Sequence, residues 1–152
     1  MLTGCRRNEI LTLRWDAVDT DAGEIRLTDS KTGTRTVSLS PETANVLTGI
    51  PRASGIPFVI AGRAGRHLRS IDGPWQKVRA RAGLRDVRLH DLRHSFASRA
   101  LALGETLPAI GRLLGHSRVE TTARYAHLAD DSVRQVAIRI SDSIADDILG
   151  ED

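Results

Sequence analysis

The segment that most constrains the fold of this chain covers residues 89–128, where three amphipathic stretches follow one another with only short turns between them. Such a succession predicts a compact set of helices. Among its side chains are His90, Arg93 and His116, together with Tyr125, the single tyrosine of the chain. These side chains supply cations, proton carriers and a phenol nucleophile, the groups needed to attack a phosphodiester without a metal ion.

The first helix of this segment is expected over residues 88–104. An inward apolar stripe supports it, formed by Leu92, Phe96, Ala100 and Leu103. His90 and Arg93 are three residues apart and therefore share a face near the beginning of this helix.

A zinc site is the alternative explanation for the histidines of this helix. His90 and His94 have the i to i+4 spacing of a HExxH metal-binding helix. However, Asp91 replaces the glutamate of that motif, Arg93 would place a positive charge beside the metal, and no third ligand is evident. We therefore expect no metal here and interpret His94 as a packed or hydrogen-bonding histidine.

The turn between the second and third helices is also specified by the sequence. The second helix is expected to stop at Gly115, a residue suited to a helix C-terminus. Ser117 and Glu120 then have the spacing of a capping box, which starts the helix that carries Tyr125. His116 falls in the corner between the two helices, where backbone geometry fixes its position.

Near the beginning of the chain, one short helix with an apolar face is expected. The face comprises Ile10, Leu11, Leu13 and Trp15. Arg6 belongs to the first turn, where a helix N-terminus already favours anions, and Glu9 lies on the same face and can orient it. The simpler alternative is a surface ion pair.

The central part of the chain predicts a small β-structure followed by helices. Two alternating runs, residues 24–28 and 34–40, flank a Lys-Thr-Gly turn, which indicates a β-hairpin with Lys31 at its tip. Ser40 before a proline predicts a helix over residues 41–47. A short buried strand is expected over residues 57–60. A further helix is expected to end at Gly83.

The helix before Gly83 combines an apolar face, Trp75 and Val78, with basic side chains suited to DNA backbone phosphates. These basic residues are Lys77, Arg79 and Arg81. Residues 63–99 carry ten Lys or Arg against three Asp, and residues 129–152 carry seven acids against two arginines. Residues 1–128 are therefore net +8 and residues 129–152 net −5, an asymmetry that suits a polyanionic partner. Taken alone, the basic run could equally be a solvated face.

Length and composition fit one domain in a reducing compartment. The 152 residues are 40% hydrophobic, enough for one core, and no segment resembles a linker. Cys5 is the single cysteine, so no internal disulfide forms. We expect neither a signal peptide nor a membrane span, and therefore a cytoplasmic location.

Four separated motifs carry a family resemblance. They are TGCRRNEILTLRW, DSKTG, LHDLRHSFAS and LLGHSRVETTARYAHL, in that order. Together they resemble the successive signatures of the tyrosine recombinase (phage integrase) family over nearly the whole chain. The resemblance implies an α+β, mainly helical catalytic-domain fold with a small antiparallel β-hairpin or sheet at one edge, and double-stranded DNA as partner.

The resemblance also implies roles for individual residues. Tyr125 would attack the scissile phosphate and form a 3′-phosphotyrosyl bond, with no metal, cofactor or ATP. Arg6 and Arg93 would bind the non-bridging oxygens, and His116 would add a hydrogen-bond donor.

Three further residues complete the implied set. Lys31 would protonate the leaving 5′ oxygen, and His90 would assist proton transfer to or from the tyrosine. Glu9 corresponds to the family's acidic residue that supports the first arginine.

Departures from the family pattern lead to expectations about the domains. Residues 1–152 are expected to form a catalytic domain that lacks its first helices and the N-terminal DNA-clamping domain. Residues 130–149 are expected to form a C-terminal helix, with an apolar stripe of Val133, Val136, Ile140, Ile144 and Ile148. This helix could pack on its own domain or dock on a neighbouring protomer in a tetramer on DNA.

Three functions therefore remain open from the sequence. The first is a site-specific recombinase of a phage, a mobile element or chromosome-dimer resolution. The second is a type IB topoisomerase, which reseals without exchanging partners. The third is an inactive remnant that acts at most as a DNA- or partner-binding fragment.

Overall fold

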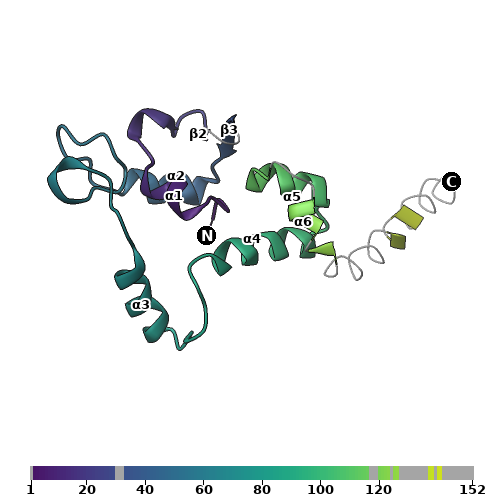
Figure 1. Cartoon of the computed structure of the whole chain (residues 1–152). Coiled ribbons are helices and arrows are strands. Elements are labelled where there is room, and N and C mark those ends of the chain that lie inside the picture. Colours follow the sequence, from purple (N-terminus) through teal and green to yellow (C-terminus); the bar gives the residue numbers. More distant parts are fainter. Residues whose placement is uncertain are drawn as a thin grey trace. The chain divides into compact units, whose positions relative to one another are not determined.

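The computed structural model describes residues 2–29, 33–116, 120–123, 125–126, 137–138 and 140–141. The chain divides into two compact units, Met1–Phe96 (unit 1) and Ala97–Asp152 (unit 2), which are treated separately below. Figure 1 labels the α-helices of both units and the strands β2 and β3. The mainly helical fold with a small antiparallel sheet confirms the fold class expected from the sequence.

Unit 1 begins with a helix that is shorter than the sequence indicated. Helix α1 covers only Arg7–Leu11, with Arg6 at its N-cap rather than within its first turn. Trp15 belongs to a separate 3-10 turn, η1 (Trp15–Ala17). Beyond α1 the backbone leaves the helical path and bonds to a distant segment instead, since the Leu13 carbonyl accepts a hydrogen bond from the Val59 amide.

A three-stranded antiparallel sheet follows, in the order β1-β2-β3. Strands β2 (Glu24–Asp29) and β3 (Gly33–Ser38) form the predicted hairpin, and Lys31 at its tip lies outside the described residues. The short β1 (Val18–Asp19) was not predicted, because a two-residue strand has too little alternation to detect.

The core of unit 1 lies against this sheet. Helix α2 (Pro41–Thr48) starts where the sequence predicted, since the Ser40 hydroxyl accepts a hydrogen bond from the Thr43 amide at 3.2 Å. The buried cluster comprises Leu13, Ile25, Leu27, Val37, Leu47 and Val59. Residues 57–60 do not form the predicted strand. Phe58 makes only an isolated bridge with Arg14, so Val59 is buried without a continuous ladder.

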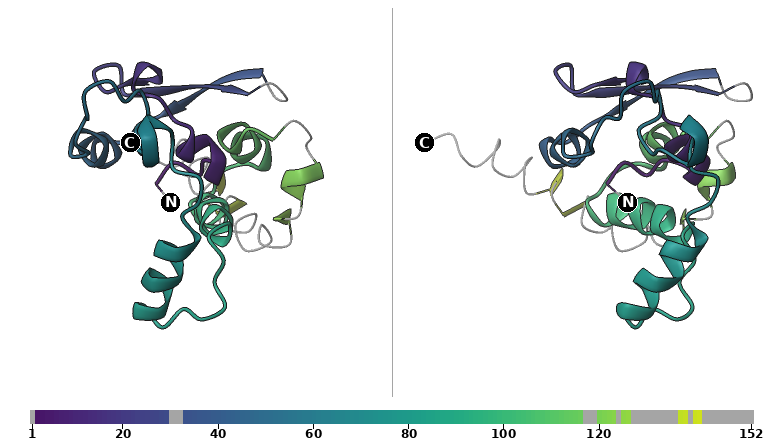
Figure 2. Two further views of the ribbon diagram at one scale, coloured as in Figure 1. Left: turned by 60° about the vertical axis from the view of Figure 1, so that its left-hand side comes forward. Right: turned by 90° about the vertical axis from the view of Figure 1, so that its left-hand side faces the viewer.

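Unit 1 continues through the 3-10 turn η2 (Arg63–Gly65) into helix α3 (Asp72–Arg81). In both views of Figure 2, the strands and α3 lie at opposite ends of this unit. Gly83 has a φ of 69°, as expected for the residue that ends this helix. Val78 is 57% exposed, and α3 has no fully buried residue. The predicted apolar face is therefore wrong at Val78, and it is Trp75 and Arg79 that donate hydrogen bonds from α3 to the Val87 carbonyl.

Helix α4 (Asp91–Ala102) begins in unit 1 and ends in unit 2. Its most buried residues are Arg93, Ala97, Ala100 and Leu101. The predicted stripe was wrong at Leu103, which is 62% exposed, because the buried face is rotated by about one residue toward the side that carries Arg93.

Unit 2 contains two further short helices, α5 (Leu107–Leu114) and α6 (Glu120–Ala123), which contact each other. Gly115 ends α5 in the left-handed conformation (φ 64°), as predicted. The proposed capping residue Ser117 lies outside the described residues. Tyr125 occupies a turn beyond α6 rather than the helix itself.

Most of the predicted C-terminal helix over residues 130–149 lies outside the described residues. Residues 137–138 and 140–141, which are described, are helical. Within the described part of the chain, no helix combines the length and apolar character needed to cross a membrane.

Candidate active site

A single carboxylate organises the beginning of unit 1. Glu9 accepts hydrogen bonds from the Arg6 backbone amide (2.6 Å) and the Arg6 guanidinium (2.9 Å). Its second oxygen also accepts from the Arg35 guanidinium at 2.8 Å. The side chains of Glu9 and Arg35 are only 11% and 15% exposed, so their ion pair is poorly screened by water. Glu9 therefore fixes the position of Arg6, more tightly than a surface ion pair would.

Arg35 was not recognised from the sequence, although its position carried a signal. It pairs with Leu27 across the hairpin, and opposed residues of an antiparallel pair point to the same face. That face is apolar at Leu27, Ile25 and Val37. A charged residue in the apolar register of a strand is therefore the feature that marks Arg35 as a partner of a buried acid.

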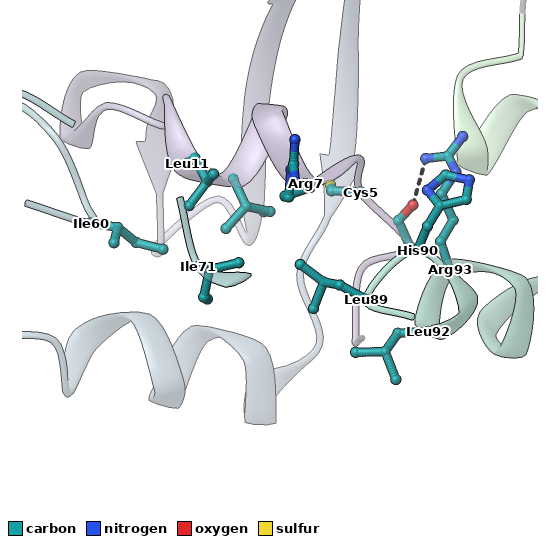
Figure 3. Close-up of a pocket in the computed structure, with 11 residues that line it drawn as sticks. Cys5, Arg7, Leu11, Ile60, Ile71, Leu89, His90, Leu92 and Arg93 are labelled. Atoms are coloured by element: carbon teal, nitrogen blue, oxygen red, sulfur yellow. Dashed lines mark hydrogen bonds between the residues drawn. The ribbon is translucent and has the colours of Figure 1, made fainter. Parts of the chain in front are cut away.

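Arg93 is the second arginine of the site and is only 6% exposed. Its guanidinium donates a 2.6 Å hydrogen bond to the Gly4 carbonyl, drawn as a dashed line in Figure 3. Gly4 has a φ of 61°, a conformation that glycine adopts at low cost, and this turn directs its carbonyl toward Arg93. Burial, followed by repulsion from the nearby Arg6, holds the pKa of Arg93 below its ordinary value.

His90 lies beside Arg93 at the edge of an apolar cavity of about 220 Å³ (Figure 3). The apolar wall comprises Ile10, Leu11, Ile60, Ile71, Leu89 and Leu92. Burial, and then the charges of His94 and Arg93, lower the pKa of His90 below its ordinary value of 6.5. The ring of His94 meets that of His90 edge to face at 5.0 Å, consistent with the packed role expected for His94. A neutral His90 can accept a proton, which is what a general base requires.

Unit 2 holds the other two predicted side chains. His116 follows Gly115, and its Nδ1 atom lies 2.8 Å from the hydroxyl of Thr122, which is 1% exposed. Helix α5 approaches closely here, because a Cβ at Gly111 would lie 2.9 Å from the same hydroxyl. Tyr125 is 5% exposed, and its amide donates to the Thr122 carbonyl. Thr122, which the sequence did not single out, therefore contacts both residues.

The predicted site residues are thus distributed over both units. Unit 1 brings together Arg6, Glu9, His90 and Arg93, and unit 2 brings together His116 and Tyr125. Lys31 lies outside the described residues.

The three basic residues predicted to bind DNA all belong to α3. Lys77 and Arg81 are exposed, whereas Arg79 is half-buried and donates to the Val87 carbonyl at 3.4 Å. Among the described residues, no group of three or more His, Cys, Asp or Glu side chains could hold a metal ion.

Comparison with known proteins identifies the family. The sequence matches the phage integrase family over residues 1–132. The chain belongs to this family. It is 34% identical over 132 residues to the tyrosine recombinase XerC of Xanthomonas axonopodis pv. citri, a match that covers 83% of this chain and 43% of XerC. The chain thus spans less than half of the length of that recombinase.

Solved structures support the same assignment. The catalytic domain of bacteriophage HP1 integrase aligns with a TM-score of 0.65 and 28% identity, over 89% of this chain and 74% of that domain. The Tn1549 transposon integrase (residues 82–397) in complex with circular intermediate DNA aligns with a TM-score of 0.71 at 20% identity, over 91% of this chain and 56% of that solved chain. The fold is therefore that of a tyrosine recombinase catalytic domain.

Proposed function

We propose that this chain carries the DNA breaking and rejoining chemistry of a site-specific recombinase. The Tyr125 phenol oxygen attacks the scissile phosphorus and forms a 3′-phosphotyrosyl bond, while the bond to the 5′ oxygen breaks. Lys31 gives that oxygen its proton, and His90 accepts the proton of the phenol. Attack by a 5′ hydroxyl on the phosphotyrosyl bond reverses these steps, so rejoining consumes no ATP.

The observation that carries this proposal is the pair of guanidiniums in unit 1. Arg6 is oriented by Glu9 and Arg93 by the Gly4 carbonyl, and burial, followed by repulsion from Arg6, lowers the pKa of Arg93. Two cations held near each other favour an anion that binds both. A phosphate with two non-bridging oxygens satisfies this requirement, and its negative charge increases as the nucleophile attacks.

His116 would add a third hydrogen-bond donor to the transition state. Its Nδ1 atom lies 2.8 Å from the Thr122 hydroxyl, a contact that orients the imidazole ring. The DNA complex of the Tn1549 transposon integrase supports double-stranded DNA as the substrate of this chain. We further propose that it acts as a tetramer on DNA, assembled through residues 130–149.

The test is covalent trapping of the protein on supercoiled plasmid in EDTA without ATP, stopped with detergent. The expected result is a protein-linked 3′ end that is absent from Tyr125→Phe. Arg93→Lys should lower the rate of adduct formation by about a hundred- to a thousandfold, the cost of losing one oriented donor to a developing anion. Arg99→Lys on the same helix is the matched control, because Arg99 is exposed.

Different outcomes separate the candidate functions. Strand exchange between two plasmids identifies a recombinase, whereas relaxation without exchange identifies a topoisomerase. DNA binding without any adduct would contradict the enzymatic proposal and leave a DNA-binding fragment. Equal rates for Arg93→Lys and the parent would show that Arg93 does not bind the scissile phosphate.

A further inference from the structure

A second positively charged feature of unit 1 begins next to the proposed phosphate site. A groove of about 600 Å³ runs between the beginning of α1 and one side of α3, and we call it the α1–α3 groove. Arg6 and His90 line one part of it. The rest is formed by polar and charged side chains that the mechanism above does not use, chiefly Arg7, Asp72, Gln76, Arg79 and Arg88.

The cations of this groove differ in how firmly they are paired. Arg6 and Arg88 each pair with a carboxylate three residues away, at 2.9 and 3.0 Å. Arg7 instead reaches Asp72 on α3, and the Nη1 to Oδ1 distance of 3.5 Å is at the upper limit for a hydrogen bond. Both side chains are about half exposed or more, at 48% and 61%. This pair is therefore the weakest of the three and the easiest for another anion to replace.

Arg79 is the other cation available to a ligand in the groove. Its guanidinium donates to the Val87 carbonyl, which also accepts from the indole of Trp75 at 3.3 Å. Among the described residues, no carboxylate lies within ion-pair distance of Arg79. Its side chain is thus positioned by a neutral acceptor and keeps its full charge for an anion.

Among the described residues that line the groove, Asp72 is the one carboxylate, and its two oxygens have different roles. The Oδ2 atom accepts from the Ser70 hydroxyl at 2.7 Å, while the Ser70 oxygen accepts from the Asp72 amide at 3.0 Å. These local bonds hold the beginning of α3. Only Oδ1 contacts Arg7, so Arg7 can leave Asp72 without disturbing the helix.

We propose that the α1–α3 groove binds the DNA backbone phosphate next to the scissile one, through Arg7 and Arg79, and that Asp72 occupies Arg7 until DNA displaces it. The inference rests on the proposed function, because the scissile phosphate must lie at Arg6 for the neighbouring phosphate to reach Arg7. A continuous basic groove with a single weakly held counter-charge fits a polyanion, which replaces one ion pair by another as it enters.

The experiment compares matched variants in binding to a fluorescein-labelled DNA duplex, measured by anisotropy over a series of NaCl concentrations. Arg14 and Asp16 provide the control, since they form an ion pair of similar exposure, 50% and 65%, that lies outside this groove. Arg7→Ala should reduce the slope of log K against log salt by about 0.9, the value for one lost phosphate contact, and Arg14→Ala should leave it unchanged.

Removal of the competing carboxylate should have the opposite effect. Asp72→Asn keeps an oxygen that can accept from Ser70. It should tighten DNA binding by about two- to fivefold more than Asp16→Asn does. This is the range expected when the exposed Arg7–Asp72 ion pair no longer has to be broken. The inference would be overturned if Arg7→Ala changed the salt slope as much as Arg14→Ala, and Asp72→Asn changed the affinity as much as Asp16→Asn. DNA binding would then depend only on the overall charge of the protein. Absence of DNA binding by the parent protein would instead contradict the proposed function itself.

Discussion

Replacement of Glu9 by Gln should destabilise unit 1 and weaken the proposed phosphate site at the same time. The Glu9 carboxylate accepts hydrogen bonds from the Arg6 amide, the Arg6 guanidinium and the Arg35 guanidinium, at 2.6, 2.9 and 2.8 Å. A glutamine of the same size offers one acceptor oxygen, and its amide nitrogen would turn N–H groups toward a guanidinium. The positive charge of Arg6 and Arg35 would also lose its counter-charge.

The magnitude follows from burial. Removing one partner of a buried ion pair costs about 3–5 kcal/mol, which applies to the largely buried Glu9 and Arg35. Arg6 is 33% exposed, so water compensates for much of the stabilisation that its ion pair with Glu9 provides. Because glutamine retains one acceptor, we expect a loss of about 2–4 kcal/mol in the free energy of unfolding.

Urea unfolding followed by circular dichroism measures this loss as a lower midpoint with an unchanged m-value. Asp16→Asn is the matched control, because it removes one carboxylate from an ion pair that is at least half exposed, and its midpoint should not change measurably. A Glu9→Gln midpoint equal to that of Asp16→Asn would refute the argument, since Glu9 would then not be the buried counter-charge of the two arginines.

Two further predictions concern packing and protonation. Gly111→Ala should destabilise unit 2 by about 1–3 kcal/mol, because the new Cβ would lie 2.9 Å from the Thr122 hydroxyl, whereas Gly49→Ala, whose Cβ would lie 3.4 Å from the Asn45 carbonyl oxygen, should change stability by less than about 1 kcal/mol. Thermal unfolding of both variants checks this, and equal shifts would contradict it. His90 should titrate below 6.5 by NMR, so its neutral form is favoured in the folded state, and the stability it supports is complete above pH 6.5 and is lost as the pH falls through its folded pKa. His94→Gln should raise the pKa of His90, because it removes a repulsive charge; a lower value would exclude that cause.

Much of the fold was predictable because its signals are local. Ser40 caps α2 and Gly115 ends α5 through contacts with residues a few positions away, so the spacing in the sequence is sufficient to place both boundaries. The hairpin of β2 and β3 follows in the same way from alternation around a short turn. Predictions were wrong where a local pattern competed with tertiary packing, as at Leu103 and in residues 57–60.

The sequence by itself predicted the members of the candidate site, since the motifs that carry the family resemblance contain Arg6, His90, Arg93, His116 and Tyr125, and their catalytic roles stay predictions. Tertiary structure decided how the described members are held. The Arg35–Glu9 ion pair joins residues 26 positions apart, and the Arg93–Gly4 hydrogen bond joins residues 89 positions apart. No periodicity relates such distant positions, because their contact depends on how the sheet, α1 and α4 of unit 1 pack together.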